Sequence, residues 1–389
     1  MAKYKLGEIC EFYSGTGFPV TYQGKAIGDF PFYKVGDIAN NVVAGNVYLS
    51  LCNNYISNQD ALEIKGTIIP KDTVVFAKIG EALKLNRRAL TSCNCLIDNN
   101  AMGIAPKRKF LQTGYFFYFM KNLKLQNFAE STTVPSVRKS KLEQIEIETP
   151  PLNTQNEVER TLDKISSLIT IRQHQLQKLD ELIKARFVEM FGNPVANEKG
   201  WHIELLKDVC NGIGDGLHGT PEYDEVGTYP FINGNNLTNG TIEITPSTKM
   251  VNIETYANHY IEISDNAILL SINGTLGKLA LYNGEKVMLG KSACYCNLRP
   301  EINREFVYGV MRTNAFAEFL ESNATASTIK NVGLKAIRNF RLIVPPDDLQ
   351  TKFVAFSRRI DKSKLQVPSG NALCIRYPIF IEMMFLRGV

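Results

Sequence analysis

The clearest hydrophobic pattern lies in the middle of the chain, after Pro150-Pro151. Apolar side chains recur there at alternating intervals of four and three residues, the heptad period of a long amphipathic helix. Glycine and proline in Phe191-Gly192-Asn193-Pro194 predict its end, so the helix is about 50 Å long at 1.5 Å per residue. A seam of this length needs a covering partner. It consists of Val158, Leu162, Ile165, Ile169, Leu176, Leu179, Ile183 and Met190, interrupted by Arg172 and Arg186.

The segments on either side of this helix have a different pattern. Residues 1–150 contain short apolar runs, such as Val74-Val75-Phe76, separated by glycine, asparagine and proline. Such punctuation predicts short strands joined by turns. One further helix is expected from about Thr113 to Phe128, where Tyr115 and Phe119 fall at helical spacing.

The two flanking segments repeat one another about 200 residues apart. Phe30-Pro31-Phe32 returns as Tyr229-Pro230-Phe231, and residues 75–80 match residues 269–274. Residues 131–137 match residues 326–332. This period is far longer than that of a solenoid repeat and therefore indicates a duplicated domain. Two copies of one domain suit a target that has two halves.

A second helix is expected after Gln350. Phe353, Phe356, Ile360 and Lys364 follow the first helix at an offset of 195 residues. Pro368 and Pro378 forbid a continuation, so this helix is expected to end by about Gln366. The tail is then either the product of a shifted reading frame or recombination, or a short helix with a capping strand. In both cases the seam from Leu176 to Met190 would be exposed or covered by a second copy of the chain, which makes self-association plausible.

These patterns define an α+β protein with two duplicated, mostly-β domains, a long coiled-coil-type helix between them and a truncated second helix. The expected boundaries are 1–150 for the first domain, 151–194 for the central helix, 195–346 for the second domain, 347–366 for the second helix and 367–389 for a divergent tail.

Composition adds a weak preference for an anionic partner. Hydrophobic residues make up 44% and charged residues 21% of the chain, as in ordinary globular proteins. The net charge of +5 is compatible with nucleic acid. Eight cysteines and no signal peptide predict a reducing cytoplasm. The most apolar stretch, Leu373 to Leu386, is too short for a membrane span.

Several short motifs recur in a fixed order. They are Pro150-Pro151-Leu152 with Gln155, Arg186 to Pro194, Gly216 to Pro221 followed by Pro230 to Leu237, and Gly274-Thr275-Leu276-Gly277-Lys278. The order resembles the DNA-specificity subunit of type I restriction-modification systems. The resemblance implies two target-recognition domains that each read half of a split double-stranded DNA site. It also implies that the helices set the spacing and dock methyltransferase subunits, and through them the restriction subunit. Methylation and cleavage would then belong to partner chains, and no cofactor is expected.

Candidate DNA contacts follow from charge and side-chain chemistry. Basic side chains bind phosphates and guanine edges, and asparagine pairs with adenine. Asparagine and glycine also form turns, and His218 could equally hydrogen-bond its own turn. The candidates in the first copy are Lys34, Lys78, Lys84, Arg87 and Arg88, and those in the second copy are His218, Asn233, Asn235, Asn236, Ser271, Asn273, Thr275 and Lys278.

Other chemistries find less support. Cys294 and Cys296 alternate with polar residues as buried strand positions do, which favours core packing over zinc. Residues 284–292 resemble a phosphate loop but have one residue too many between the glycines. No methyltransferase, Rossmann or Ser-His-Asp motif is present in the sequence. Two alternatives remain, a coiled-coil scaffold that binds only protein and a stand-alone nuclease or NTPase.

Overall fold

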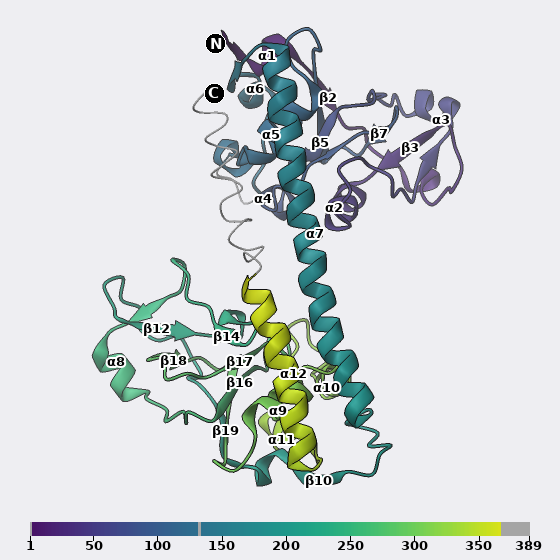
Figure 1. Ribbon diagram of the computed structural model, residues 1–389. Helices are drawn as coiled ribbons and strands as arrows, with labels where there is room; N and C mark the ends of the chain where they lie inside the picture. Colours follow the sequence, from purple (N-terminus) through teal and green to yellow (C-terminus); the bar gives the residue numbers. More distant parts are fainter. Residues whose placement is uncertain (1, 131–133, 367–389) are drawn as a thin grey trace. The chain divides into compact units, whose positions relative to one another are not determined.

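The computed structural model describes residues 2–130 and 134–366, which divide into two compact units (Figure 1). The described part of the first unit ends at Gln173, and that of the second begins at His174. Helix α7 (Leu152–Phe191) contributes residues to both units. Its 40 residues confirm the long helix that the heptad pattern predicted. No described helix is long and apolar enough to cross a membrane.

The first unit is built on short antiparallel strands. Its largest sheet has the order β2 (Cys10–Ser14), β8 (Ala101–Pro106), β5 (Val74–Ala77), β6 (Ala89–Leu90). A second sheet has the order β4 (Tyr55–Ile56), β3 (Phe30–Tyr33), β7 (Leu96–Ile97), in which β3 and β7 are parallel. Strand β1 (Ala2–Lys5) pairs with β9 (Glu146–Thr149). The helices are α1 (Leu6–Ile9), η1 (Val20–Tyr22), α2 (Val35–Val43), α3 (Asn58–Glu63), α4 (Glu81–Lys84), α5 (Thr113–Asn122), η2 (Leu125–Phe128) and α6 (Lys139–Glu143).

One helix boundary differs from the prediction. The sequence predicted a single helix from Thr113 to Phe128, but α5 ends at Asn122 and a separate 3-10 turn, η2, follows. The reason is local, because Leu123 has an extended backbone with ψ of 118°.

The second unit repeats this topology. Its main sheet has the order β11 (Cys210–Asp215), β19 (Ala293–Leu298), β16 (Ala267–Ser271), β17 (Leu279–Leu281), and its smaller sheet β15 (Met250–Val251), β12 (Tyr229–Ile232), β18 (Met288–Leu289). Strand β10 (His202–Leu205) pairs with β20 (Arg341–Val344), and β13 (Leu237–Thr238) with β14 (Thr241–Ile242). The helices are η3 (Leu206–Asp208), η4 (Gly234–Asn236), α8 (Ile253–Asn258), α9 (Arg304–Met311), α10 (Asn314–Ser322), α11 (Leu334–Arg338) and α12 (Asp347–Gln366).

Two isolated bridges of the first copy recur at matching positions in the second copy. The parallel bridge between Thr16 and Asp98 returns as the bridge between Leu217 and Gly290. The antiparallel bridge between Ile79 and Ser136 returns as that between Asn273 and Asn331. The duplication therefore extends to the loops, and these bridges define which loop positions correspond.

Each unit has a core that includes part of α7. Val158 and Leu162 belong to the core of the first unit, while Ile183, Phe187 and Phe191 belong to that of the second. Cys294 and Cys296 on β19 are fully buried in the second core, which confirms the core packing that their alternation predicted.

Within the second unit, α12 runs antiparallel to the C-terminal part of α7 (Figure 1). Phe353 meets Phe187 with 5.2 Å between ring centroids, and Lys364, further along α12, bonds Asp180, which precedes Phe187. Of the predicted seam, Leu162, Ile169 and Ile183 are buried, whereas Ile165, Leu176, Leu179 and Met190 are half-buried. The described part of α12 reaches Gln366, and the expectations for residues 367–389 lie outside the described residues.

Candidate nucleic-acid interface

Two loops of the second unit are joined beyond the end of strand β16. The Asn273–Asn331 bridge is flanked by hydrogen bonds from the Val332 amide to the Ile272 carbonyl and from the Gly274 amide to the Lys330 carbonyl, each 2.9 Å long. Gly274 has φ of +77°, a conformation that side chains rarely adopt. Gly274, which corresponds to Gly80 in the first copy, therefore allows this turn to form.

A pocket of about 460 Å³ lies beside this bridge. Its apolar lining is formed by Ile272, Val332 and Leu334, and its polar lining by Asp215, His218, Asn273, Lys291 and Asn331. His218 Nε2 lies 2.8 Å from Asp215 Oδ2. The pocket thus presents two amides, one ammonium and an imidazole–carboxylate pair.

A glycine holds the His218 loop close to its neighbour. A Cβ on Gly216 would lie 2.0 Å from the Leu289 carbonyl oxygen, so only glycine fits this approach. Gly15 occupies the same place in the first unit, where a Cβ would lie 1.8 Å from the Asp98 carbonyl oxygen. Two chain segments therefore meet at the same point in both copies.

The first unit has the same loop framework but different side chains. The Val137 amide donates to the Lys78 carbonyl at 2.9 Å, as the Val332 amide does to Ile272, so Lys78 corresponds to Ile272. The bridges likewise pair Ile79 with Asn273 and Ser136 with Asn331. A shared frame with different polar groups is suited to reading different ligands.

Several predicted basic residues of the first unit remain accessible. Lys84 is exposed and forms an ion pair with Glu81 at 2.6 Å. Lys78 and Arg87 are half-buried. Lys34 is half-buried, donates to Gln23 Oε1 and lies 5.7 Å from the centroid of the Phe18 ring. Their contact with DNA stays a prediction.

Arg88, by contrast, is not accessible, and its predicted contact with DNA finds no support in its position. Its side chain is only 4% exposed. Its Nε donates to the Met120 carbonyl at 2.9 Å, and its Nη2 donates to the Leu123 carbonyl at 3.0 Å. Burial lowers the pKa of the guanidinium to about 9. Arg88 therefore satisfies carbonyls at the C-terminal end of α5 and is not available to a phosphate.

Ser271 is likewise inaccessible. This residue is fully buried in β16, and its hydroxyl donates to the Thr275 carbonyl. It therefore closes the turn that follows the strand. Thr275 itself is exposed, and Lys278 is half-buried with its Nζ 3.4 Å from the Asn235 carbonyl oxygen.

The three asparagines separate into different roles. Asn236 Oδ1 accepts from the Asn233 amide at 3.0 Å, while its Nδ2 donates to the Glu243 carbonyl at 3.0 Å. Asn233 Oδ1 accepts from the Ser292 hydroxyl at 2.8 Å. Both side chains thus form the turn, which was the alternative interpretation of these residues. Asn235 is exposed.

Sequence reasoning missed three residues of the pocket, Asp215, Lys291 and Asn331. Lys291 lies in the segment that resembled a phosphate loop, and it is exposed. Asn331 occurs in one of the repeated segments, but nothing in its own sequence marked it. The repeat alignment could have found it only together with the bridge to Asn273.

Comparison with known proteins gives consistent results. The family model for the type I restriction modification DNA specificity domain matches residues 1–181 and 198–368. A putative type I restriction enzyme specificity subunit of Haemophilus influenzae is 22% identical over 402 residues, covering 93% of this chain and 96% of that protein. The specificity subunit of the type I restriction enzyme MjaIX of Methanocaldococcus jannaschii is 22% identical over 369 residues, covering 84% and 78%.

A solved structure supports the fold. It comes from work on complex assembly and conformational transition of a type I R-M system and matches with a TM-score of 0.51 at 17% identity. The match covers 99% of this chain and 97% of that chain.

Proposed function

The chain belongs to the family of type I restriction modification DNA specificity domains, and from this premise we propose that each repeat contacts one half of a bipartite DNA site. The chain is a DNA-specificity subunit, and the catalytic activities lie in partner subunits. The protein-binding scaffold considered as an alternative is not favoured, because the family match covers both repeats.

One observation carries the proposal of two separate readers. The same bridged loops occur in both units, but Asn273 and Asn331 of the second unit replace Ile79 and Ser136 of the first. Sequence is read through hydrogen bonds to base edges, whereas backbone contacts position the protein. A conserved frame with changed polar groups supports two half-sites of different sequence.

In the second unit we assign base contact to the pocket beside the bridge. Asn273 and Asn331 each carry an amide that can bond N6 and N7 on the major-groove edge of adenine, and Lys291 can bond guanine or a phosphate. Asn235 and Thr275, which are exposed, are further candidates. In the first unit the corresponding candidates are Lys78, Lys84 and Arg87, with Lys34 at the side of the small sheet.

A domain exchange tests the proposal. Residues 1–150 would be replaced by the corresponding domain of another family member, and the chimera would be assembled with its methyltransferase partner. Mapping the methylated positions in DNA should show one altered half-site and one unchanged half-site. A chimera that changes both halves, or neither, contradicts the assignment of one half-site to each repeat.

The methyltransferase subunit is proposed to dock on α7, but not through the core-facing part of the predicted seam. Leu162 and Ile183 are buried within this chain, so a partner cannot reach them. Leu168 and Ile171 are 56% and 53% exposed. Leu182 is 45% exposed, and its spacing from Leu168 places it on the same helix face. An exposed apolar stripe of this kind fits a helix of a partner subunit.

Two finer expectations stay proposals. For self-association, the half-buried Leu176 and Leu179 are the seam positions that a second copy could cover. Action on DNA together with methyltransferase subunits supports the cytoplasm as the proposed location.

A further inference from the structure

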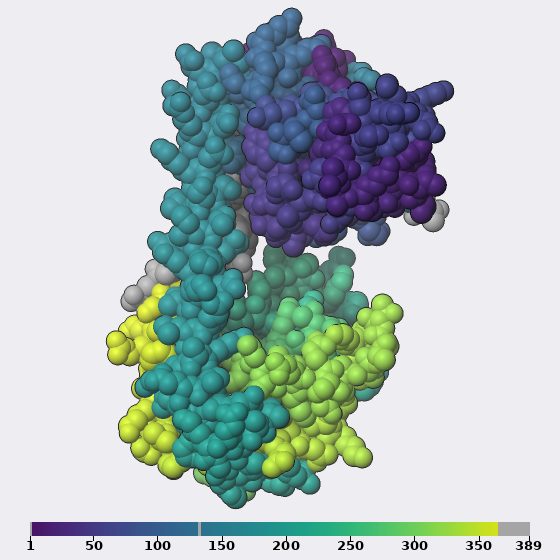
Figure 2. Space-filling model, turned by 90° about the vertical axis from the view of Figure 1, so that its right-hand side faces the viewer, coloured from purple at the N-terminus to yellow at the C-terminus, as the bar shows by residue number. Residues whose placement is uncertain are grey.

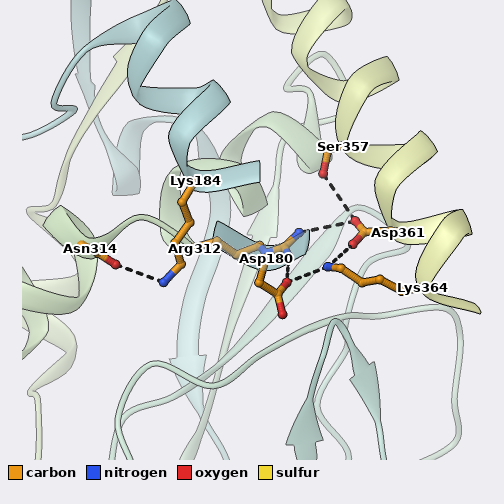
Figure 3. A network of polar contacts seen from close by, with 7 residues as sticks. All are labelled: Asp180, Lys184, Arg312, Asn314, Ser357, Asp361 and Lys364. Carbon is orange, nitrogen blue, oxygen red and sulfur yellow. Dashed lines mark hydrogen bonds and ion pairs between the residues drawn. The ribbon is translucent and has the colours of Figure 1, made fainter. Parts of the chain in front are cut away.

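A compact group of charges joins three elements of the second unit (Figure 3). Arg312, the C-cap residue of α9, donates through Nη2 to Asp180 Oδ1 on α7 at 2.6 Å. Its Nη1 lies 3.4 Å from Asp361 Oδ2 on α12. Lys364 of α12 bonds the same two carboxylates, with Nζ 2.6 Å from Asp180 Oδ1 and 2.7 Å from Asp361 Oδ1. We call Asp180, Arg312, Asp361 and Lys364 the charge quartet.

The charge quartet is neutral overall and its cations are shielded from water. The side chains of Arg312 and Lys364 are 14% and 17% exposed, whereas both carboxylates are 43% exposed. Each cation contacts both carboxylates, so removing one member leaves a shielded charge without full compensation. Arg312 also lies 5.3 Å from the centroid of the Tyr308 ring, which fixes its direction.

The rest of the α7–α12 contact is mostly aromatic. Phe353 packs on Phe187 and Phe191, and Arg186 lies over Phe356. The apolar positions of α12 continue to Ile360 and then give way to Lys364. If α12 slipped by one turn, Leu349 would take the place of Phe353 against Phe187 and Phe191, so an apolar side chain would still meet these rings. At Asp180, however, Ile360 would replace Lys364 and leave the carboxylate without its ammonium partner.

From this difference we propose that the charge quartet fixes the register between α12, the second recognition domain and α7, and thereby the spacing at which the second half-site is read. Polar groups within an apolar helix contact can specify register at a cost in stability. A one-turn slip moves the domain about 5.4 Å along the helix. Since base pairs stack about 3.4 Å apart, this equals about one and a half base pairs. The inference rests on the proposed function.

The first experiment uses a variant that removes the charges but keeps the volume. Asp180→Leu, Arg312→Met, Asp361→Leu and Lys364→Met are combined in the full chain. An apolar replacement of a complete ion network often leaves stability unchanged or increased. The assembled complex is then offered DNA in which the two half-sites are native and the spacer is varied by one or two base pairs. Discrimination against the wrong spacers is expected to fall about tenfold, with half-site preference unchanged.

A second measurement does not involve DNA. Spin labels are attached through non-canonical side chains at Gln177 on α7 and Lys362 on α12, both exposed positions. The native chain should give one narrow distance, and the apolar variant a broadened or second distance. One unchanged narrow distance in the apolar variant overturns the proposal.

Two controls separate the possible failures. If the native complex shows no half-site preference, the proposed function fails, while the spin-label distances still decide the register. If the fourfold variant does not fold, Lys364→Met alone is measured, because Asp361 and Arg312 keep most contacts of that site. A Lys364→Met chain with native distances and native spacer discrimination also overturns the proposal. Lys362→Met, one exposed position on the same turn, serves as the matched control for the spacer assay.

Discussion

Arg87 and Arg88 are neighbours in the chain with opposite surroundings. Arg87 is half-buried at the loop surface, while Arg88 is buried against the carbonyls that end α5. Their sequence context is the same, so charge alone could not distinguish them. The difference comes from Met120 and Leu123, which lie more than 30 residues away in the sequence.

Substitution should separate the two arginines. Arg88→Ala is expected to lower the free energy of unfolding by about 2–4 kcal/mol, because it leaves buried carbonyls without a donor. Arg87→Ala should change it by less than about 0.5 kcal/mol, as surface substitutions do. Urea denaturation measures both. Equal stabilities for the two variants would contradict a structural role of Arg88.

The pocket residues of the second unit should affect one half-site only. Lys291→Ala and Asn331→Ala are each expected to weaken specific binding by about 1–3 kcal/mol if the side chain contacts a base edge. Lys286→Ala is the matched control, because Lys286 is exposed in the same segment but does not line the pocket. The affinity of each variant is measured for DNA with single base changes in one half-site or in the other. If Lys286→Ala has the same effect as Lys291→Ala, the pocket is not the reading surface.

At the scale of elements, the central helix was the most predictable part of the chain. The helix was expected in residues 151–194, and α7 spans Leu152–Phe191. The two ranges are close because heptad spacing, the prolines and the glycine are all local signals. The sequence did not show which face of α7 packs against which part of the chain. The seam is divided between two cores, and the exposed Leu168, Ile171 and Leu182 form a second stripe that the heptad assignment left out.

Phe353 should be essential to the contact between α7 and α12. It is fully buried among Phe187, Phe191 and Phe306. Phe353→Ala is expected to destabilise the second unit by about 3–5 kcal/mol through loss of buried area and the cavity left behind. Val188→Ala on the exposed face of α7 should have little effect. Hydrogen exchange of α12 and thermal unfolding would reveal the difference, and a Phe353→Ala protein as stable as the Val188→Ala control would contradict this packing.

The exposed stripe predicts a separate effect on assembly. Leu168→Asp with Ile171→Asp should weaken binding of the methyltransferase subunit at least about tenfold, because a charge would enter the apolar contact. The melting temperature should change little, since both side chains already face solvent. In Figure 2 the teal atoms of the C-terminal part of α7 form an uncovered strip beside the yellow atoms of α12. Thr170→Asp is the control, and sedimentation of the mixed subunits measures binding. Unchanged assembly of the double variant would exclude this stripe as the docking surface.

At the scale of the whole molecule, both the duplication and its correspondence in these loops were visible in the sequence. The match of residues 75–80 with 269–274 places Lys78 opposite Ile272, and the match of residues 131–137 with 326–332 places Ser136 opposite Asn331. The backbone hydrogen bonds agree with both pairs. What the sequence could not show is that these two segments meet, because residues far apart in the chain form the bridge between Asn273 and Asn331.

A charge-deletion variant tests independence of the two repeats. Lys78→Ala, Lys84→Ala and Arg87→Ala together should reduce the salt dependence of binding by up to about three units, one for each lost phosphate contact. Preference at the second half-site should stay unchanged. Lys107→Ala with Lys109→Ala provides a control. Both lysines follow Pro106, which pairs with Cys10 at the end of the sheet opposite to Ser14 and the bridged loops. Relaxed preference in both half-sites would show that the repeats do not act separately.

Sharing α7 between two cores also has a consequence for synthesis of the chain. Phe187 and Phe191 emerge from the ribosome more than 150 residues before Phe353, which covers them. At about 5–20 residues per second, these aromatic rings wait roughly 10–30 s for their partner. During this time the nascent chain carries the first domain together with a helix end whose aromatic side chains are not yet covered. Chaperones that hold unfolded chains can bind the exposed rings in that interval. Fragments released from ribosomes that stall before α12 would be prone to aggregate.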